Sequence, residues 1–307
     1  MRKVYTIGET VMDIVFSNNV PVAAKPGGSM LNVAVSLGRL KIPVSFVSEF
    51  GKDKVGDIIN DFLIHNGIDT QYINRYTDGK SAVALAFLDE NQKADYSFYK
   101  FYPAERLKIG IPAISSGDIV MFGSYFGIAP EIRPTLMKIL FEAKAQGAVI
   151  IYDPNFRKAH LHQLKELLPF IRENFQLADI IKGSDEDFEN IFGVSSAQDA
   201  FSSLNDTTKI LIYSRGKDGV DFCSYQYQFH TEARNIEPLS TIGAGDNFNA
   251  GLAYGLIKND IFRRDLESPA IEVWKKNIQI GVDFASEVCL SYDNYLSENF
   301  VTDYLKN

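Results

Sequence analysis

The chain has 307 residues, of which 46% are hydrophobic and 23% charged, so it can bury a sizeable core in one large domain or two modest ones. The formal net charge is -8 and no long basic run is present, which argues against nucleic acids and anionic membrane surfaces as partners. Cys223 and Cys289 are too few and too far apart for a disulfide framework or a CxxC metal site, which fits a reducing compartment. Since the N-terminal residues show no signal peptide or membrane span, we expect a cytoplasmic protein.

The apolar pattern predicts short strands that alternate with helices along most of the chain. In chain order it predicts strand 4–7, helix 30–40, strand 44–47, helix 53–65, two strand-like runs at 82–88 and 96–101 around a turn at 89–92, strand 119–122, helix 130–146, strand 149–152, helix 161–175, strand 180–181, helix 185–191, strand 210–213 and helices 246–256 and 270–288. This alternation is typical of βαβ units and indicates a parallel sheet covered on both faces. The insert at 81–102 departs from it and is either a lid or oligomer contact, or a plain surface excursion.

The segment from Thr241 to Gly251, TIGAGDNFNAG, carries the most chemical information. Gly243 and Gly245 permit a tight turn and remove side chains that would block a ligand. The turn enters a helix predicted to start near Asp246, whose unpaired N–H groups and positive dipole end form a site for phosphate oxygens. Asp246 could accept the proton of an attacking hydroxyl there, because phosphoryl transfer depends mainly on positioning and electrostatics. The alternative is an ordinary N-cap aspartate after a glycine-rich turn.

Two other nucleotide-binding motifs are missing from the sequence. Gly216-Lys217 is followed by Asp218, and no glycine stands five residues earlier, so there is no GxxxxGK[ST] P-loop. Phe248 occupies the place of the third glycine in GxGxxG. These observations disfavour a Walker-type ATPase and a nicotinamide-dependent oxidoreductase of doubly wound fold.

Five segments together resemble the PfkB, or ribokinase-like, family of carbohydrate kinases. They are Gly8-Glu9 with Asp13, the run 27–40 that begins Gly27-Gly28-Ser29-Met30-Leu31-Asn32, then Asp153-Pro154-Asn155-Phe156-Arg157, Gly216-Lys217-Asp218-Gly219, and 241–246. Their order and spacing hold across almost the whole chain. The resemblance implies an α/β fold, a ribokinase-like three-layer α/β/α sandwich with a mostly parallel central sheet. It also implies that residues 1–307 form a single kinase domain with a small β-strand lid built from about 10–25 and 81–102.

The resemblance assigns roles to individual residues. Asp246 would be the catalytic base, helped by the backbone of Gly243, Ala244 and Gly245. Sugar hydroxyls would be bound by Asp13, Gly28 and Asn32, and phosphate or substrate oxygens by Arg157. From the residues alone, Gly28 could equally belong to a plain turn, Asn32 could be a helix-start residue, and Arg157 could be a solvated surface charge. The nucleotide would be bound by Ser214, Gly216, Gly219, Thr241, Gly243 and Gly245. ATP with Mg2+ would be the phosphoryl donor.

Three departures from the family pattern affect these expectations. Ser240 stands where potassium-activated members carry Asp, which leaves activation by a monovalent cation doubtful. The NxxE motif, tied to magnesium and phosphate, is replaced by Ser184-Asp185-Glu186-Asp187, so Asp187 or Glu186 would act on the metal through water. The usual Gly-Ala near the adenine loop is missing around 291–295.

The sugar is indicated by Phe98-Tyr99-Lys100 followed by Pro103-Ala104-Glu105, which resembles the FYRxxxAD segment of fructokinases. This resemblance implies a fructokinase that converts D-fructose to fructose 6-phosphate. Kinases of 2-keto-3-deoxygluconate share much of the pattern, and Lys100 could bind the carboxylate of that sugar acid. A non-catalytic sugar-binding paralogue is a further alternative, motivated by the changes at 184–187, 240 and 291–295. Because a lid made of strands often pairs with its copy, we expect a homodimer through the lid.

Overall fold

The computed structural model describes residues 2–88, 94–267 and 270–306, so the turn predicted at 89–92 lies outside the described residues. Its described strands form a 10-stranded central sheet in the order β14-β13-β12-β11-β10-β9-β1-β4-β5, with β6 pairing β4. The strands are β1 (Val4–Ile7), β4 (Val44–Gly51), β5 (Ile68–Asp69), β6 (Ile73–Tyr76), β9 (Ile119–Gly123), β10 (Val149–Asp153), β11 (Ile180–Ser184), β12 (Ile210–Ser214), β13 (Val220–Cys223) and β14 (Gln228–Thr231).

The central sheet is parallel from β12 through to β5, which confirms the sheet type predicted from the alternating pattern. β13 and β14 continue it antiparallel at one edge. Every residue of β1, β4, β9 and β10 is buried, as expected for strands covered on both faces.

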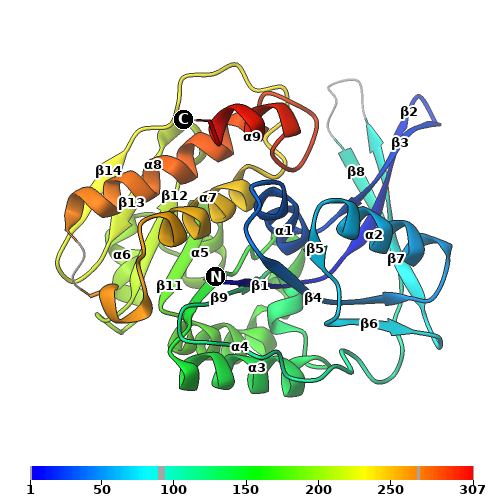
Figure 1. Cartoon of the computed structure of the whole chain (residues 1–307), viewed down its shortest axis with the longest axis horizontal. Helices are drawn as coiled ribbons and strands as arrows, with labels where there is room; N and C mark the ends of the chain where they lie inside the picture. Colours follow the sequence, from blue (N-terminus) through cyan, green and yellow to red (C-terminus); the bar gives the residue numbers. More distant parts are fainter. Residues whose placement is uncertain (1, 89–93, 268–269, 307) are drawn as a thin grey trace.

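Helices cover both faces of this sheet and complete a three-layer α/β/α sandwich (Figure 1). One face packs against α1 (Ser29–Arg39), α2 (Lys54–His65), α7 (Ala244–Lys258), α8 (Ile271–Val288) and α9 (Glu298–Tyr304). The other packs against α3 (Arg133–Gln146), α4 (Leu164–Leu177), α5 (Asp185–Phe192) and α6 (Ala197–Ser203). Short 3-10 turns are η1 (Tyr125–Ile128), η2 (Lys158–Gln163), η3 (Gly216–Asp218) and η4 (Arg263–Asp265). The helix predicted from residue 161 begins at Leu164 because η2 precedes it.

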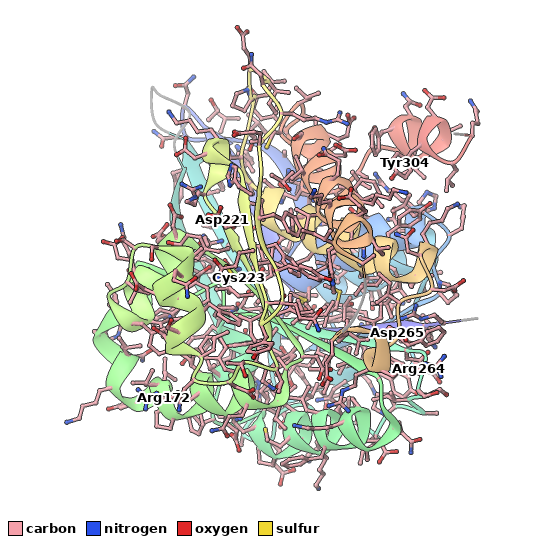
Figure 2. All side chains as sticks on the ribbon, turned by 90° about the vertical axis from the view of Figure 1, so that its left-hand side faces the viewer. Arg172, Asp221, Cys223, Arg264, Asp265 and Tyr304 are labelled. Carbon is pink, nitrogen blue, oxygen red and sulfur yellow. The ribbon has the colours of Figure 1, made fainter. Side chains whose placement is uncertain are left out.

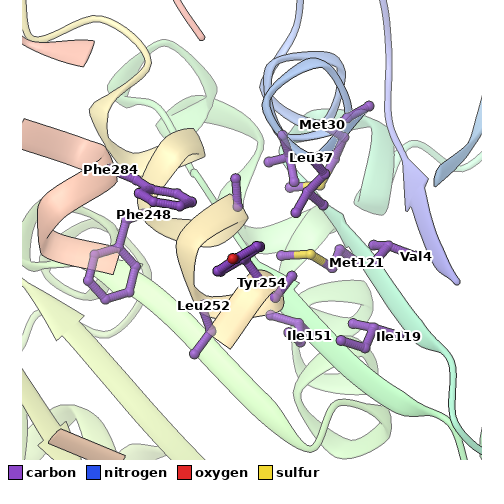
Figure 3. Packing of buried hydrophobic residues seen from close by; sticks show 14 of the residues in the cluster. Val4, Met30, Leu37, Ile119, Met121, Ile151, Phe248, Leu252, Tyr254 and Phe284 are labelled. Carbon is purple, nitrogen blue, oxygen red and sulfur yellow. The ribbon is translucent and has the colours of Figure 1, made fainter. Parts of the chain in front are cut away.

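α7 is held against the sheet and against α8 by close packing. In Figure 3, Leu252 and Tyr254 of α7 lie beside Met121 and Ile151 of the central strands. A Cβ on Gly251 would lie 2.7 Å from the Cα of Gly281 in α8, so the two helices can touch only with glycine here. This packing fixes where the first turn of α7 meets the sheet.

A second, four-stranded sheet stands beside the sandwich as a lid (Figure 1). Its order is β3-β2-β7-β8, with β2 (Val11–Ser17), β3 (Val20–Gly27), β7 (Lys80–Leu88) and β8 (Ala94–Phe101). β2 pairs antiparallel with β3 and parallel with β7. The expected small β lid is therefore present, and its described strands span 11–17, 20–27, 80–88 and 94–101. No helix in the described ranges is long and apolar enough to cross a bilayer.

Candidate active site

The candidate site lies where the parallel strands of the central sheet end. Glu9 follows β1 and Asp153 ends β10, and because both strands pair in parallel with β9 their carboxyl ends meet at one edge. Ligands of open α/β sheets bind at this edge. α7 begins there too, since a Cβ on Gly245 would lie 3.0 Å from the Nζ of Lys182 on β11.

In the glycine turn before α7 the Ala244 amide donates to the carbonyl oxygen of Thr241 at 3.3 Å, so the amides that remain for a ligand are those of Gly243 and Gly245. Gly243 caps the helix with φ 83°, and a Cβ there would lie 2.8 Å from the carbonyl oxygen of Asn294. Both features require glycine. The helix begins at Ala244, slightly earlier than predicted, so Gly245 and Asp246 lie inside its first turn. First-turn amides have no intrahelical acceptor, so these N–H groups and the helix dipole can hold an anion.

Asp246 is fixed by two side chains of α1. Ser29 Oγ donates to Asp246 Oδ1 at 2.6 Å, and Asn32 Nδ2 donates to Asp246 Oδ2 at 2.8 Å. The helix cap is Gly243, so Asp246 is not the ordinary N-cap that was the alternative. Burial raises the pKa of the Asp246 carboxyl, while the hydrogen bonds from Ser29 and Asn32 oppose that rise. A carboxylate poised in this way can accept a proton from a bound hydroxyl.

The start of α1 brings the predicted sugar residues together. Gly28 caps α1 with φ 136°, and a Cβ there would clash with the carbonyl oxygen of Glu9. A Cβ on Gly27 would likewise clash with Asp13 Oδ2. Asn32 is buried, and its Oδ1 atom has no hydrogen-bond partner among the described residues. An unpaired buried acceptor beside Asp246 is ready to accept a hydrogen bond from a ligand hydroxyl.

Asp13 lies on the lid strand β2, opposite Lys25 of β3. Burial raises the pKa of Asp13 to about 6, although Lys25 opposes the rise. Lys25 Nζ donates to the carbonyl oxygen of Tyr292 at 2.5 Å and lies 3.4 Å from Asn294 Oδ1. Because Asn294 also packs against Gly243, Lys25 links the lid to the segment behind the glycine turn that precedes α7.

Lys100 and Arg157 have different surroundings. Lys100 Nζ on β8 forms an ion pair with Glu9 Oε2 at 3.0 Å, and the Tyr102 hydroxyl donates to the same oxygen at 3.4 Å. The predicted Lys100 is therefore at the site but already neutralised by a carboxylate of the sandwich. Arg157 is exposed at the start of η2. Its contact with a substrate stays a prediction.

A buried polar network at the end of β10 was missed from the sequence. Lys182 Nζ forms an ion pair with Asp153 Oδ2 at 3.1 Å, and Asn249 Nδ2 of α7 donates to the same oxygen at 2.7 Å. One signal could have found it, since Lys182 is a lysine inside the apolar run of β11. The sequence motifs also contain Ser29 and Glu9, but no function was predicted for either residue.

The predicted metal residues lie at the start of α5. Asp187 is buried, and its carboxylate accepts from Phe156 N at 2.6 Å and from Ser184 N and Oγ, each at 2.7 Å. Glu186 is exposed and lies 3.9 Å from Lys158 Nζ. Within the described ranges, no three His, Cys, Asp or Glu side chains are grouped to hold a metal directly. A role through water therefore fits Glu186 better than Asp187, whose oxygens already have protein donors.

The predicted nucleotide turn follows β12. Ser214 ends the strand, and the turn uses positive φ at Gly216 (54°) and Gly219 (86°). Arg215 in this turn pairs with Asp221 of β13 at 3.0 Å, on the edge of the molecule that faces the viewer in Figure 2. Thr241 is exposed just before the glycine turn that precedes α7. The part these residues take in nucleotide binding stays a prediction.

A carboxylate at a helix start with free amides, set at the carboxyl edge of a parallel sheet and under a lid, defines a phosphotransferase that acts on an alcohol group. The family model described as pfkB family carbohydrate kinase matches residues 1–294, and the chain belongs to this family. It is therefore a carbohydrate kinase.

Curated relatives agree with this assignment, and solved structures share the fold. The protein named "Probable fructokinase-2" from Arabidopsis thaliana is 29% identical over 262 residues, covering 81% of this chain and 80% of that protein. Fructokinase-2 from Solanum lycopersicum is 27% identical over 246 residues, covering 78% and 75%. A fructokinase double mutant from Vibrio cholerae O395, solved with fructose, ADP and potassium, aligns with TM-score 0.84 at 20% identity over 99% of this chain and 98% of that one. Aminoimidazole riboside kinase from Salmonella enterica, with its riboside and an ATP analogue, aligns with TM-score 0.83 at 22% identity over 99% and 100%.

Proposed function

We propose that this kinase transfers the γ-phosphoryl group of ATP to D-fructose, giving fructose 6-phosphate and ADP. The observation that carries the chemistry is the position of Asp246. Its carboxylate lies in the first turn of α7, beside amides that can bind phosphate, and is held by two side chains of α1. One group of residues can thus hold both the attacking hydroxyl and the phosphoryl group.

The proposed reaction uses these residues in a single displacement. The 6-hydroxyl of fructose lies against Asp246, which takes its proton as the oxygen attacks the γ-phosphorus. The bond from that phosphorus to the β-γ bridging oxygen breaks, and ADP leaves. The amides of Gly243 and Gly245 stabilise the negative charge on the transferring group, as preorganised donors do. The Ala244 amide, which was expected to act with them, already donates to the Thr241 carbonyl oxygen. Asp13 and the unpaired Oδ1 of Asn32 accept hydrogen bonds from other sugar hydroxyls.

The nucleotide is proposed to lie between the glycine turn that precedes α7 and the turn after β12. Ser214, Gly216, Gly219 and Thr241 would contact ATP there. Mg2+, when bound with the nucleotide, neutralises charge on the β- and γ-phosphates. Glu186 is the exposed carboxylate that would reach its water shell, with Asp187 holding the start of α5 in place.

The ion pair between Lys100 of the lid and Glu9 of the sandwich favours a neutral sugar over a sugar acid. Lys100 is the cation that could bind a sugar-acid carboxylate, but Glu9 lies 3.0 Å from it. A second carboxylate at this place would meet the negative charge of Glu9. The fructokinase names of the relatives support the same choice. The alternative substrate is 2-keto-3-deoxygluconate, which would require Lys100 to leave Glu9.

A coupled assay of ADP release over a panel of sugars tests the proposal. We expect the highest kcat/KM with D-fructose and phosphorylation at O6, which NMR of the product identifies. Turnover of 2-keto-3-deoxygluconate without turnover of fructose would assign the alternative substrate. Sugar binding by calorimetry without phosphoryl transfer from any nucleotide would assign a non-catalytic paralogue.

We further propose a cytoplasmic homodimer of single-domain chains. The lid strands expose large apolar side chains, with Val20 59%, Val22 58%, Tyr99 60% and Phe101 66% exposed. Such a patch favours contact with a second copy of the lid. ATP as the donor and two unpaired thiols, Cys223 and Cys289, are consistent with the cytoplasm. Light scattering after size exclusion should give twice the chain mass; a monomer would contradict the dimer.

A further inference from the structure

The side chain of Lys182, in β11, points toward the first turn of α7. Ile180, two residues earlier on the strand, belongs to the core on the face that α7 covers, and alternation places Lys182 on the same face. The side chain of Lys182 is 6% exposed. A cation buried to this degree needs acceptors, because an isolated ammonium in an apolar interior is strongly unfavourable.

The protein supplies one hydrogen-bond acceptor for this ammonium in the described part of the chain. That acceptor is Asp153 Oδ2, at 3.1 Å, and Asn249 shares it. An ammonium has three donors, so Lys182 keeps hydrogen-bonding capacity. The carboxylates of Asp187 and Asp246 also act on its charge, which places it among three acids at the site.

No side chain separates Lys182 from the first turn of α7, because residue 245 is glycine. A Cβ there would lie 3.0 Å from Lys182 Nζ, closer than ordinary van der Waals contact. A phosphate oxygen that accepts from the Gly245 amide at about 2.9 Å is therefore also within reach of the ammonium. Glycine at position 245 therefore leaves the ammonium accessible to an anion held at the first turn of α7.

We propose that Lys182 is a further catalytic residue, whose ammonium donates a hydrogen bond to the transferring phosphoryl group from beneath the amides of α7. Asp153 and Asn249 position the ammonium. Negative charge on the phosphoryl oxygens is thus met by the amides on one side and by a full positive charge on the other. This role rests on the proposed function, because it requires the phosphoryl group to lie at the first turn of α7.

The competing explanation is that Lys182 only neutralises the buried carboxylate of Asp153. Three variants separate the two roles: Lys182→Met, Asp153→Asn and the double variant with both changes. The double variant leaves no unpaired charge, and Asn249 can still donate to the amide oxygen at position 153. A structural lysine predicts that the double variant recovers the kcat of Asp153→Asn, whereas a catalytic lysine predicts that it stays as slow as Lys182→Met.

The expected loss in Lys182→Met is about 10²- to 10³-fold in kcat, the effect of removing one donor to a developing anion. The assay uses whichever sugar the native enzyme phosphorylates, so failure of the fructose assignment leaves this test intact. Lys209→Met is the matched control. Lys209 is a second buried lysine, 8% exposed and 3.4 Å from Asp206, before β12. The Lys209→Met substitution should lower the melting temperature and leave kcat within about twofold of the native value.

A second measurement needs no turnover. Calorimetry compares the affinity for MgADP alone with the affinity for MgADP plus aluminium fluoride, which imitates a transferring phosphoryl group. In Lys182→Met the affinity for MgADP should stay within about threefold, while the gain from aluminium fluoride falls at least about tenfold. An unchanged gain, or a double variant as fast as Asp153→Asn, would overturn the proposal.

Discussion

The side-chain amide of Asn32 donates to Asp246 Oδ2 across 2.8 Å, joining α1 to α7 over 214 positions of sequence. A carboxylate only accepts, so the Asn32 nitrogen must face Asp246 and the Asn32 oxygen must face away. That oxygen is buried and has no partner among the described residues. One side chain thus orients the base and leaves an acceptor for a sugar hydroxyl.

Asn32→Ala should impair the base. With one donor lost, the pKa of Asp246 rises further above its ordinary value, and the ionised form that accepts the proton becomes scarcer. The acid limb of the kcat profile should move upward by about one pH unit, the equivalent of one charged hydrogen bond. Asn259→Ala, which removes hydrogen bonds at the far end of α7, should lower stability and leave this profile unchanged.

Sugar capture should depend on the ionisation of Asp13. Its pKa is raised to about 6 by burial, so it is protonated in the free enzyme at more acidic pH and then accepts hydroxyl donors less well. Measured kcat/KM for the sugar should fall as pH drops through about 6, and Asp13→Asn should flatten that fall. The free energy of unfolding should depend on pH in the opposite direction. Because the pKa of Asp13 is raised in the folded state, this residue stabilises the fold at low pH, and the contribution is lost as pH rises from about 4 through about 6. A sugar kcat/KM that is level across this range would contradict the assignment.

Gly243→Ala should damage both the fold and nucleotide use. The residue has φ 83°, and the new Cβ would lie 2.8 Å from the carbonyl oxygen of Asn294. The matched control is Gly147→Ala, with φ 75° and no atom within 4 Å of the new Cβ. Both variants should lose about 1 kcal/mol to backbone strain. Gly243→Ala alone should raise the KM for ATP, by about tenfold or more, since each tenfold corresponds to 1.4 kcal/mol. Equal kinetics in the two variants would show that the turn does not bind phosphate.

Glu9→Gln should relax the choice of sugar. The change frees Lys100 from its ion pair at 3.0 Å, so the lid presents an unpaired cation. The ratio of kcat/KM for 2-keto-3-deoxygluconate to that for fructose should rise by about tenfold, the effect of roughly 1.4 kcal/mol of charge interaction. If the ratio does not move, the Lys100–Glu9 pair does not determine specificity.

The sequence pattern predicted the parallel sheet, the strands at 82–88 and 96–101 and the turn before α7, because apolar periodicity and glycine spacing are local signals. The other part of the lid, at about 10–25, was expected only from the family resemblance. The pattern could not show that Lys100 is neutralised by Glu9, since 91 positions separate them. Nor could it show that Asp153, Lys182 and Asn249 converge, because they come from two strands and a helix. Arg157 is exposed at the start of η2, and the ligand contact suggested by its motif stays a prediction.

The most direct measurement is the single-turnover rate of phosphoryl transfer in Asp246→Asn. The change keeps the shape of the side chain but removes the base, so the rate should fall about 10²- to 10⁴-fold while MgATP affinity stays within about threefold. The matched control is Asp199→Asn, which alters the third residue of α6, also bonded to a serine hydroxyl at 2.7 Å, and should transfer at the native rate. If Asp246→Asn phosphorylates its sugar as fast as the native enzyme does, Asp246 is not the base.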